Sequence, residues 1–360
     1  MSTTLKTSTS PSSTTKSGFI IGPLADSLLI IGAPLVALVI AGSAFSLPDT
    51  VFRGSVQTLR IDLRQALIAI FVNAHLFLVF FRSHANPTIF GMYPVRFVAV
   101  PIALLSLGAM SPLALGFMSL VAVWWDVYHS SLQTFGFGRI YDSKLKNDAT
   151  VGRSLDYWMN LLFYLGPVLA GAHFVDHLEI GLTDLQYLTG EGGALSELFL
   201  QRTPDFLQRH QTHLAVAILA VGVPFVVYYL YSYYRLHQRG YRVSWQKVWL
   251  MIITSAVSIY SWGFRSFIDA FWVMNFFHAL QYFAIVSFAE HRNLSQVLLT
   301  SRFAHGGALA ILWVCLFCFM YGLWTVYFAV GEWSVSLIVT TSLLHFWYDG
   351  FIWSVKKKQV

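Results

Sequence analysis

Hydrophobic residues gather along the chain into about ten long stretches, and short polar segments separate them. Each stretch is close to the ~20 residues that a helix needs to cross the hydrocarbon core of a bilayer. The predicted fold class is therefore all-α, a polytopic membrane helix bundle with about ten transmembrane helices. The predicted helices cover Ile20–Leu47, Arg64–Phe81, Phe97–Met110, Leu113–Ile140, Leu155–Val175, Thr212–Tyr234, Trp245–Phe264, Phe267–Ala289, Phe303–Val330 and Ser334–Val355.

The polar segments divide the chain into a tail and one membrane domain. Residues 1–18 are rich in Ser and Thr, and no short apolar region with a small-residue cleavage site follows them. This composition predicts a disordered cytoplasmic tail rather than a signal peptide. Residues 19–356 form a single predicted transmembrane domain without an internal repeat. Its longest polar connection, residues 176–211, carries several glycines and acids and is predicted to be an outer loop.

The distribution of basic residues predicts the orientation. If the amino terminus lies inside, most of the 23 Lys and Arg residues fall in segments on the inner side, including the run Lys356–Lys358. Basic residues are retained on the cytoplasmic side of membrane helices. The sequence therefore predicts that both termini are cytoplasmic, in an integral protein that we expect in a bacterial inner membrane.

Composition supports a membrane protein and excludes two other classes. The chain is 56% hydrophobic and 11% charged, whereas soluble domains average about 25% charged residues. The net charge of +6 is spread over short loops, so no basic face for nucleic acid is expected. Cys315 and Cys318 lie one turn apart in an apolar stretch, so we expect no disulfide between them.

Four predicted helices each carry one histidine inside the apolar stretch, namely His75, His129, His278 and His345. All four helices are predicted to run from outside to inside. From the helical rise, each histidine lies roughly 10–20 Å from the inner boundary, so the four share one layer. Ionisable residues at this depth are costly and usually face the interior of the bundle for a functional reason.

Polar side chains three or four residues from three of these histidines lie on the same helix faces, namely Asp126, Gln133, Asn275, Gln281 and Asp349. Neutral imidazole is a common ligand of iron, copper and zinc. A ligating histidine usually donates its other N–H to a carboxylate, amide or carbonyl. The preferred interpretation is that these five residues accept such hydrogen bonds, and direct ligation of the metal, for example by Asp349, is the alternative. One cation would also satisfy four buried imidazoles that would otherwise each cost a few kcal/mol. The pattern predicts a metal site.

Simpler explanations exist for single histidines. One intramembrane histidine alone more often forms a hydrogen bond between helices than a metal bond. The pairs His173/His177 and His210/His213 lie in or beside the predicted outer loop. An exposed zinc site is an alternative for these pairs, but solvated loop histidines are the preferred interpretation.

Four sequence boxes carry a resemblance to known families. They are NAHLFLVFFRSH (73–84), YHSSLQTFGFGRIY (128–141), NFFHALQYFAIV (275–286) and HFWYDGFIW (345–353). Together they resemble a family of bacterial multi-pass membrane proteins of unestablished activity, over most of the chain.

A more remote similarity is to the Brp/Blh-type carotene dioxygenases. In that family, four histidines on separate helices are held to bind one ferrous ion, and the last is followed four residues later by aspartate, as His345 is by Asp349. By order along the chain, the resemblance implies that His75, His129 and His278 fill the other ligand positions. The first box departs from that family's pattern, because Ala74 precedes this histidine where that family has proline.

The expected function is that of a membrane-embedded oxygenase or desaturase, an O₂-dependent oxidoreductase with non-haem Fe(II). Its partners would be the bilayer, a lipophilic isoprenoid or acyl substrate and an unidentified redox partner. Phe277, Phe346 and Trp347 are expected wall positions for the substrate. One alternative is a b-type haem protein that transfers electrons. A second is a proton-coupled transporter that uses Asp126, Asp349 and the histidines as a relay.

Overall fold

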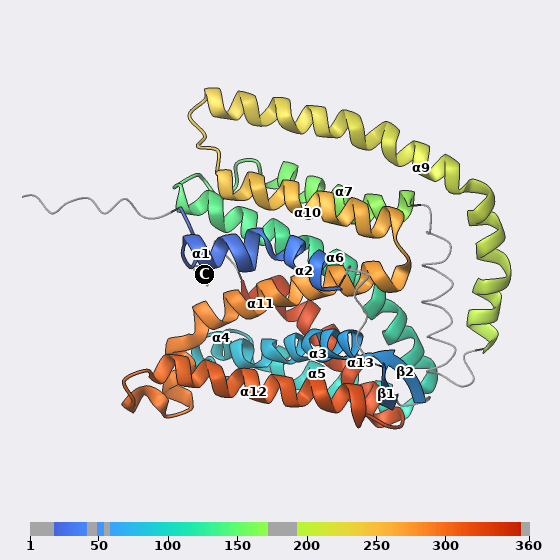
Figure 1. Ribbon diagram of the computed structural model, residues 1–360, viewed down its shortest axis with the longest axis vertical. Helices are drawn as coiled ribbons and strands as arrows, with labels where there is room; N and C mark the ends of the chain where they lie inside the picture. The colour runs from blue at the N-terminus through green and yellow to red at the C-terminus, as the bar shows by residue number, and fades with distance from the viewer. Residues whose placement is uncertain (1–17, 42–48, 54–57, 172–192, 354–360) are drawn as a thin grey trace, which may run out of the picture.

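The computed structural model describes residues 18–41, 49–53, 58–171 and 193–353. In these ranges the chain is a bundle of helices with one short β-ribbon (Figure 1). The elements before the centre of the chain are α1 (Pro23–Ala25), the π-helix η1 (Asp26–Ile31), α2 (Ala33–Ala41), β1 (Asp49–Arg53), β2 (Thr58–Asp62), α3 (Leu63–Ser83), α4 (Pro87–Met92), α5 (Pro94–Met110), α6 (Pro112–Lys144) and α7 (Arg153–Ala170). The later elements are α9 (Gly193–Gln238), α10 (Trp245–Phe264), α11 (Phe267–Val297), η2 (Thr300–Arg302), α12 (Gly306–Tyr327) and α13 (Glu332–Ile352).

The architecture is that of a multi-pass membrane protein. Among the described residues, 6 helices are long and apolar enough to cross a bilayer, namely α3, α10, α12, α13 and most of α9 and α11. The pair formed by Pro23–Ile31 and Ala33–Ala41 bends by 52° and brings the number to 7 if it is one span. The sequence prediction of about ten spans is therefore confirmed only in part.

The remaining predicted spans are helical but fall short for physical reasons. Helix α5 has 17 residues, which is short for a full crossing. Helices α6 and α7 carry the polar residues of buried clusters, among them Asp126, Arg139 and Asp156. The polar positions that build these clusters lower the mean hydropathy of the two helices.

The long loop predicted for residues 176–211 is wrong in its second half. Helix α9 begins at Gly193 and continues without interruption to Gln238, which makes it 46 residues long. The segment that follows Gly193 is rich in Ala, Leu, Glu, Gln and Arg, which all favour helix, so the polar composition did not prevent it. Residues 172–192, which include His173 and His177, lie outside the described residues.

The predicted polar connector over residues 48–63 contains regular structure as well. Strands β1 and β2 pair antiparallel, with Asp49 opposite Asp62 and Arg53 opposite Thr58. This ribbon lies at one end of the bundle, whereas the start of the described chain and the connection between α9 and α10 lie at the other (Figure 1). At that second end, Asn147 donates a hydrogen bond to the carbonyl of Arg242, so the connection between α6 and α7 lies beside the connection between α9 and α10.

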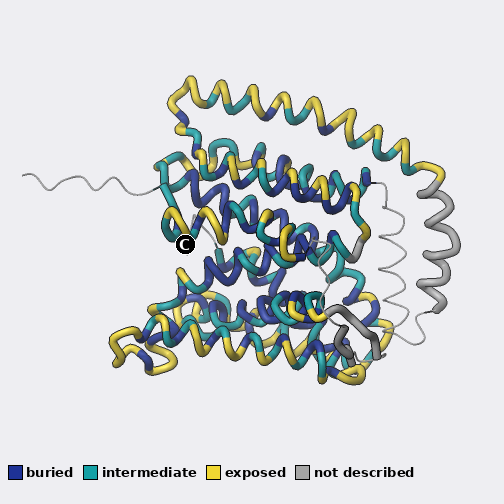
Figure 2. The backbone as a smooth tube through the Cα atoms, in the orientation of Figure 1, coloured by how far each residue is buried: buried dark blue, intermediate teal, exposed yellow. Residues whose placement is uncertain are grey.

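Helix α9 runs along the outer edge of the bundle (Figure 1). It packs mainly against α7, and only 6% of its apolar span is buried (Figure 2). A helix that is apolar on nearly all its exposed surface suits contact with lipid chains. The helices at the centre are buried instead, with 67% of the α11 span inside the protein.

Close packing positions the central helices. Helix α3 packs against α12 and α11, while α6 packs against α7, α10 and α13. At the contact between α3 and α12, a Cβ atom added to Gly322 would collide with the carbonyl of Ile70. A glycine is therefore required at this crossing, as at other sites where membrane helices approach closely. This contact holds α3, and with it His75, against the bundle.

Candidate metal centre

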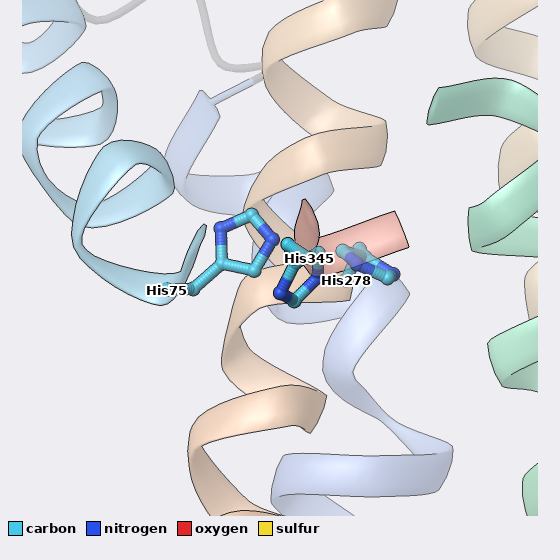
Figure 3. Close-up of side chains that lie close together, drawn as sticks. All are labelled: His75, His278 and His345. Atoms are coloured by element: carbon cyan, nitrogen blue, oxygen red, sulfur yellow. The ribbon is translucent and has the colours of Figure 1, made fainter. Parts of the chain in front are cut away.

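The four intramembrane histidines project from α3, α6, α11 and α13 into one space in the centre of the protein. Their exposed fractions are between 0% and 4%. The ring centres of His75 and His345 are 4.8 Å apart, and those of His75 and His278 are 5.1 Å apart (Figure 3). His129 lies 4.9 Å from both His278 and His345. The shared depth expected from the sequence is therefore found in the structure.

These distances fit ligands arranged around one ion. With a metal–nitrogen bond of ~2.1 Å, ring centres of neighbouring imidazole ligands lie ~4.5–5.2 Å apart and those of opposite ligands ~6.4 Å. The four adjacent pairs fall in the first range, and His278 and His345 are 6.0 Å apart. His75 and His129 occupy the two remaining corners between them.

Most of the imidazole ring nitrogens in this cluster have no hydrogen-bond partner. Nε2 of His75, Nε2 of His129 and both ring nitrogens of His278 and His345 are buried without a hydrogen-bond partner among the described residues. Buried polar atoms are satisfied in the great majority of cases, so such a cluster calls for an explanation. His75 Nδ1 contacts the carbonyl of Val72 and donates its proton there, which leaves the lone pair of Nε2 directed at the other rings.

Two overlapping sets of groups could hold a metal ion. The first is His75, His278 and His345, and the second is His129, His345 and Asp349. Within each set, the donor atoms lie within 4.8 Å of one another. Because His345 belongs to both sets, one centre bounded by four imidazoles and one carboxylate accounts for the arrangement.

Asp349 lies close to two of the four histidines. Its Oδ2 lies 3.7 Å from His129 Nε2 and 3.9 Å from His345 Nε2. Both distances are too long for a hydrogen bond and short enough for all three atoms to reach one ion. The carboxylate is therefore close enough to be an additional ligand, whereas the sequence analysis preferred the role of a hydrogen-bond acceptor for a ligating histidine.

Two residues that the sequence analysis missed hold this carboxylate. Tyr282 donates its hydroxyl proton to Asp349 Oδ1 over 2.8 Å, and Trp353 Nε1 donates to the same oxygen over 3.0 Å. The Tyr282 ring also lies 4.6 Å from the ring of His345. Tyr282 follows His278 by one helical turn and Trp353 follows Asp349 by one turn, so the same spacing rule could have found them.

The hydrogen bonds of Gln133 and Gln281 connect the helices around the imidazole rings. Gln133 Nε2 donates to the backbone carbonyl of His278 over 3.1 Å and to Gln281 Oε1 over 2.9 Å. Gln281 Nε2 donates in turn to the carbonyl of Ile30 in η1 over 2.7 Å. The two glutamines therefore fix α6, α11 and η1 against one another beside the site.

Asp126 and Asn275 lie one turn before His129 and His278, respectively, and are buried. Their side chains hydrogen-bond to each other, which couples α6 to α11. Asn275 also donates to the carbonyl of Phe271 over 3.2 Å. Among the described residues, this pair braces α6 against α11, and neither side chain forms a hydrogen bond with an imidazole.

A cavity of about 100 Å³ adjoins the site. His129, Asp349 and Phe346 are among the residues that line it, and the rings of Phe346 and His129 are 4.9 Å apart. Phe346 is thus a wall residue, as expected from the sequence. Phe277 and Trp347 pack into the hydrophobic cores instead.

Other histidines lie away from this centre. The rings of His210 and His213 are 5.8 Å apart on the exposed surface of α9. His237 Nδ1 lies 3.2 Å from the carbonyl of Tyr241 near the end of α9. Neither location brings a third potential ligand close enough among the described residues for a metal site.

Comparisons with known proteins leave these residues as the basis for assigning a function. No family model, no curated protein and no solved structure matches this chain.

Proposed function

We propose that this protein is a membrane-embedded oxygenase or desaturase that uses O₂ and a non-haem Fe(II) ion to act on a lipophilic isoprenoid or acyl substrate. His75, His129, His278 and His345 would hold the ion, with Asp349 beside them. The remote similarity to the Brp/Blh-type carotene dioxygenases supports the choice of iron. When bound, the ion would supply the redox chemistry that activates O₂.

The observation that carries the proposal is the group of buried imidazole nitrogens with no other partner, facing one point beside a cavity. A purely structural histidine would have a hydrogen bond. The residues of the chain have three tasks in such a site. The imidazoles would bind the ion, Tyr282 and Trp353 hold the carboxylate of Asp349 in place, and the apolar walls would exclude water from the reacting bond.

The alternative of a b-type haem has weaker support. Two histidines that bind one haem must face each other from opposite sides of the porphyrin plane, with the iron between them. His278 and His345 have a separation of 6.0 Å that could span a metal, but His75 and His129 lie 4.8–5.1 Å from each of them. Those two rings fill the space that the porphyrin plane would need.

We further propose ten crossings, with the bent pair α1–α2, α5, α6 and α7 added to the 6 apolar helices. Both termini would then be cytoplasmic, in a bacterial inner membrane. The distribution of Lys and Arg supports this orientation. Reporter fusions that are active only in the cytoplasm should be active at both ends of the chain. Activity at one end alone would require an odd number of crossings.

The test of the metal site is elemental analysis of protein purified in detergent, with alanine variants at each of the four histidines. We expect about one iron per chain in the unaltered protein and loss of most of the metal in each variant. The unaltered protein should show no haem Soret absorption. An iron-free protein that stays folded under anaerobic purification and does not take up Fe(II) would contradict the proposal.

The matched control is His237→Ala. His237 is also a histidine in a long helix, but it contacts a backbone carbonyl at the end of α9 rather than the other rings. This variant should retain full metal content. Equal metal loss in the control would show that metal loss reports damage to the bundle rather than removal of a ligand.

A further inference from the structure

The cavity beside the candidate metal centre is elongated along helix α6. It lies between α6, α11 and α13, begins at His129 and Asp349 and extends along α6 to Ile140. Its length along α6 is about 16 Å from the helical rise. Its volume of about 100 Å³ is several times the space that one water molecule needs.

Most of the cavity wall is apolar. Leu132, Phe137 and Ile285 line it, together with Gly136 on α6 and Gly350 on α13. A Cβ atom added to either glycine would meet no atom within 4 Å, so both glycines leave open space. Such a wall fits an alkyl or isoprenoid chain rather than a sugar or a nucleotide.

One polar atom in this wall has no partner. Gln133 Oε1 is buried and accepts no hydrogen bond from any described residue. The oxygen and nitrogen of this side-chain amide cannot be interchanged by a flip, because Gln133 Nε2 donates to two oxygens, the His278 carbonyl and Gln281 Oε1. Gln281 is itself oriented by its donation to the Ile30 carbonyl. A flipped Gln133 amide would bring three acceptor oxygens together.

We propose that the cavity binds a long-chain or isoprenoid alcohol, and that Gln133 Oε1 accepts a hydrogen bond from its hydroxyl group. This inference names a substrate class for the proposed function. Binding of the alcohol needs no metal, so only the reaction of the bound alcohol rests on the proposed function. A buried acceptor without a donor carries a desolvation penalty, so a site of this kind discriminates against analogues that lack the donor.

The position of Gln133 also orients the bound alcohol. Gln133 follows His129 by one turn of α6, about 6 Å along the axis. The hydroxyl group would therefore lie near the candidate metal centre, and the carbons next to it would be the closest to His129 and Asp349. The apolar tail would extend past Gly136 toward Ile140.

A photolabelling competition tests this proposal. The probe is a twelve-carbon primary alcohol with a diazirine near its tail, added to the purified full-length protein in lipid nanodiscs. The competitors are 1-dodecanol and dodecyl methyl ether, which differ in the donor proton. We expect 1-dodecanol to compete about tenfold better than the ether, the size expected for one hydrogen bond to a buried acceptor. The label should fall on residues 132–140 and 346–353.

Two variants and a control isolate the role of Gln133. Gln133→Leu should reduce the preference for the alcohol to less than about twofold. Gly136→Leu should abolish labelling by filling the cavity while leaving Gln133 intact. Gln296→Leu, at an exposed position in α11, should behave as the unaltered protein does.

The outcomes separate this inference from the proposed function. Equal competition by the alcohol and the ether in the unaltered protein, or a label outside the cavity, would overturn the inference even if iron is bound. A clear preference for the alcohol in a protein that binds no iron would support the inference and contradict the proposed oxygenase function. If Gln133→Leu does not fold, Gly136→Leu and the two competitors still decide the result.

Discussion

At the scale of single residues, Asp349 shows how one carboxylate can serve two purposes. Oδ1 accepts hydrogen bonds from Tyr282 and Trp353, and Oδ2 faces the Nε2 atoms of His129 and His345. The two donors fix the plane of the carboxylate, so the second oxygen stays directed at the imidazoles. This geometry makes Asp349 a ligand candidate of the same rank as the histidines.

Replacement of Asp349 by asparagine should therefore weaken metal binding. The amide keeps an acceptor for Tyr282 and Trp353 but removes the negative charge from the side that faces the rings. We expect a 10–100-fold lower affinity for Fe(II), measured by competition with a chelator under anaerobic conditions. Asp269→Asn, at a half-exposed carboxylate near the start of α11, is the control and should leave the affinity unchanged. An unchanged affinity in Asp349→Asn would limit this residue to a structural role.

At the scale of helices, a second buried cluster joins α6, α7, α9 and α10 at the end of the bundle away from the β-ribbon. Asp156 Oδ2 accepts from Arg139 Nη1 over 2.7 Å and from Lys247 Nζ over 2.6 Å, while Oδ1 accepts from the hydroxyls of Tyr229 and Tyr233. Asp142 pairs with the same two cations. Two cations and two carboxylates thus balance, and helices distant in sequence are fixed to one another.

Loss of the Asp156 charge should destabilise the whole bundle. Asp156→Asn leaves two buried cations with one carboxylate, and breaking a buried pair in this way costs about 3–5 kcal/mol. The measurement is the free energy of unfolding in mixed micelles. The control is Asp269→Asn, which breaks a pair with Arg265 whose side chains are 35% and 40% exposed. It should cost less than about 1 kcal/mol. Equal losses in the two variants would mean that burial does not set the strength of the Asp156 cluster.

At the scale of the molecule, the candidate centre connects four helices that span most of the sequence, from α3 to α13. One hydrophobic core includes residues of three of these helices, for example Leu78, Tyr282 and Leu344. A metal ion at this point would therefore stabilise the native arrangement as a crosslink, since the unfolded chain lacks a preformed site.

Removal of the metal should accordingly lower the melting temperature. At a free Fe(II) concentration about 1,000 times the dissociation constant, binding contributes ~4 kcal/mol to stability. We expect a chelator to lower the melting temperature of the unaltered protein in nanodiscs and Fe(II) to restore it. His278→Ala should melt at the lower temperature with or without Fe(II). If the chelator has no effect on a protein that contains iron, the ion does not hold the helices together.

The sequence by itself determined the all-helical class, the 6 apolar helices that are long enough to cross a bilayer, and the common level of the four histidines. Apolar stretches of sufficient length become helices in a bilayer whatever their neighbours, and a helix has a constant rise, so histidines at similar distances from the ends of neighbouring helices lie at one level. The same periodicity selected Asp349, Gln133 and Gln281, because residues one turn apart lie on one face.

Only the tertiary structure decided which groups those helix faces contact. The rotation of each helix about its axis depends on side-chain packing across the bundle, as at Gly322 against Ile70, and this cannot be read from one helix alone. Packing therefore decided that Asp349 Oδ2 faces two imidazoles, that Asp126 pairs with Asn275, and that Gln133 presents an unpartnered oxygen to a cavity. It also decided that α9 stands at the edge of the bundle, where only 6% of its apolar span is buried.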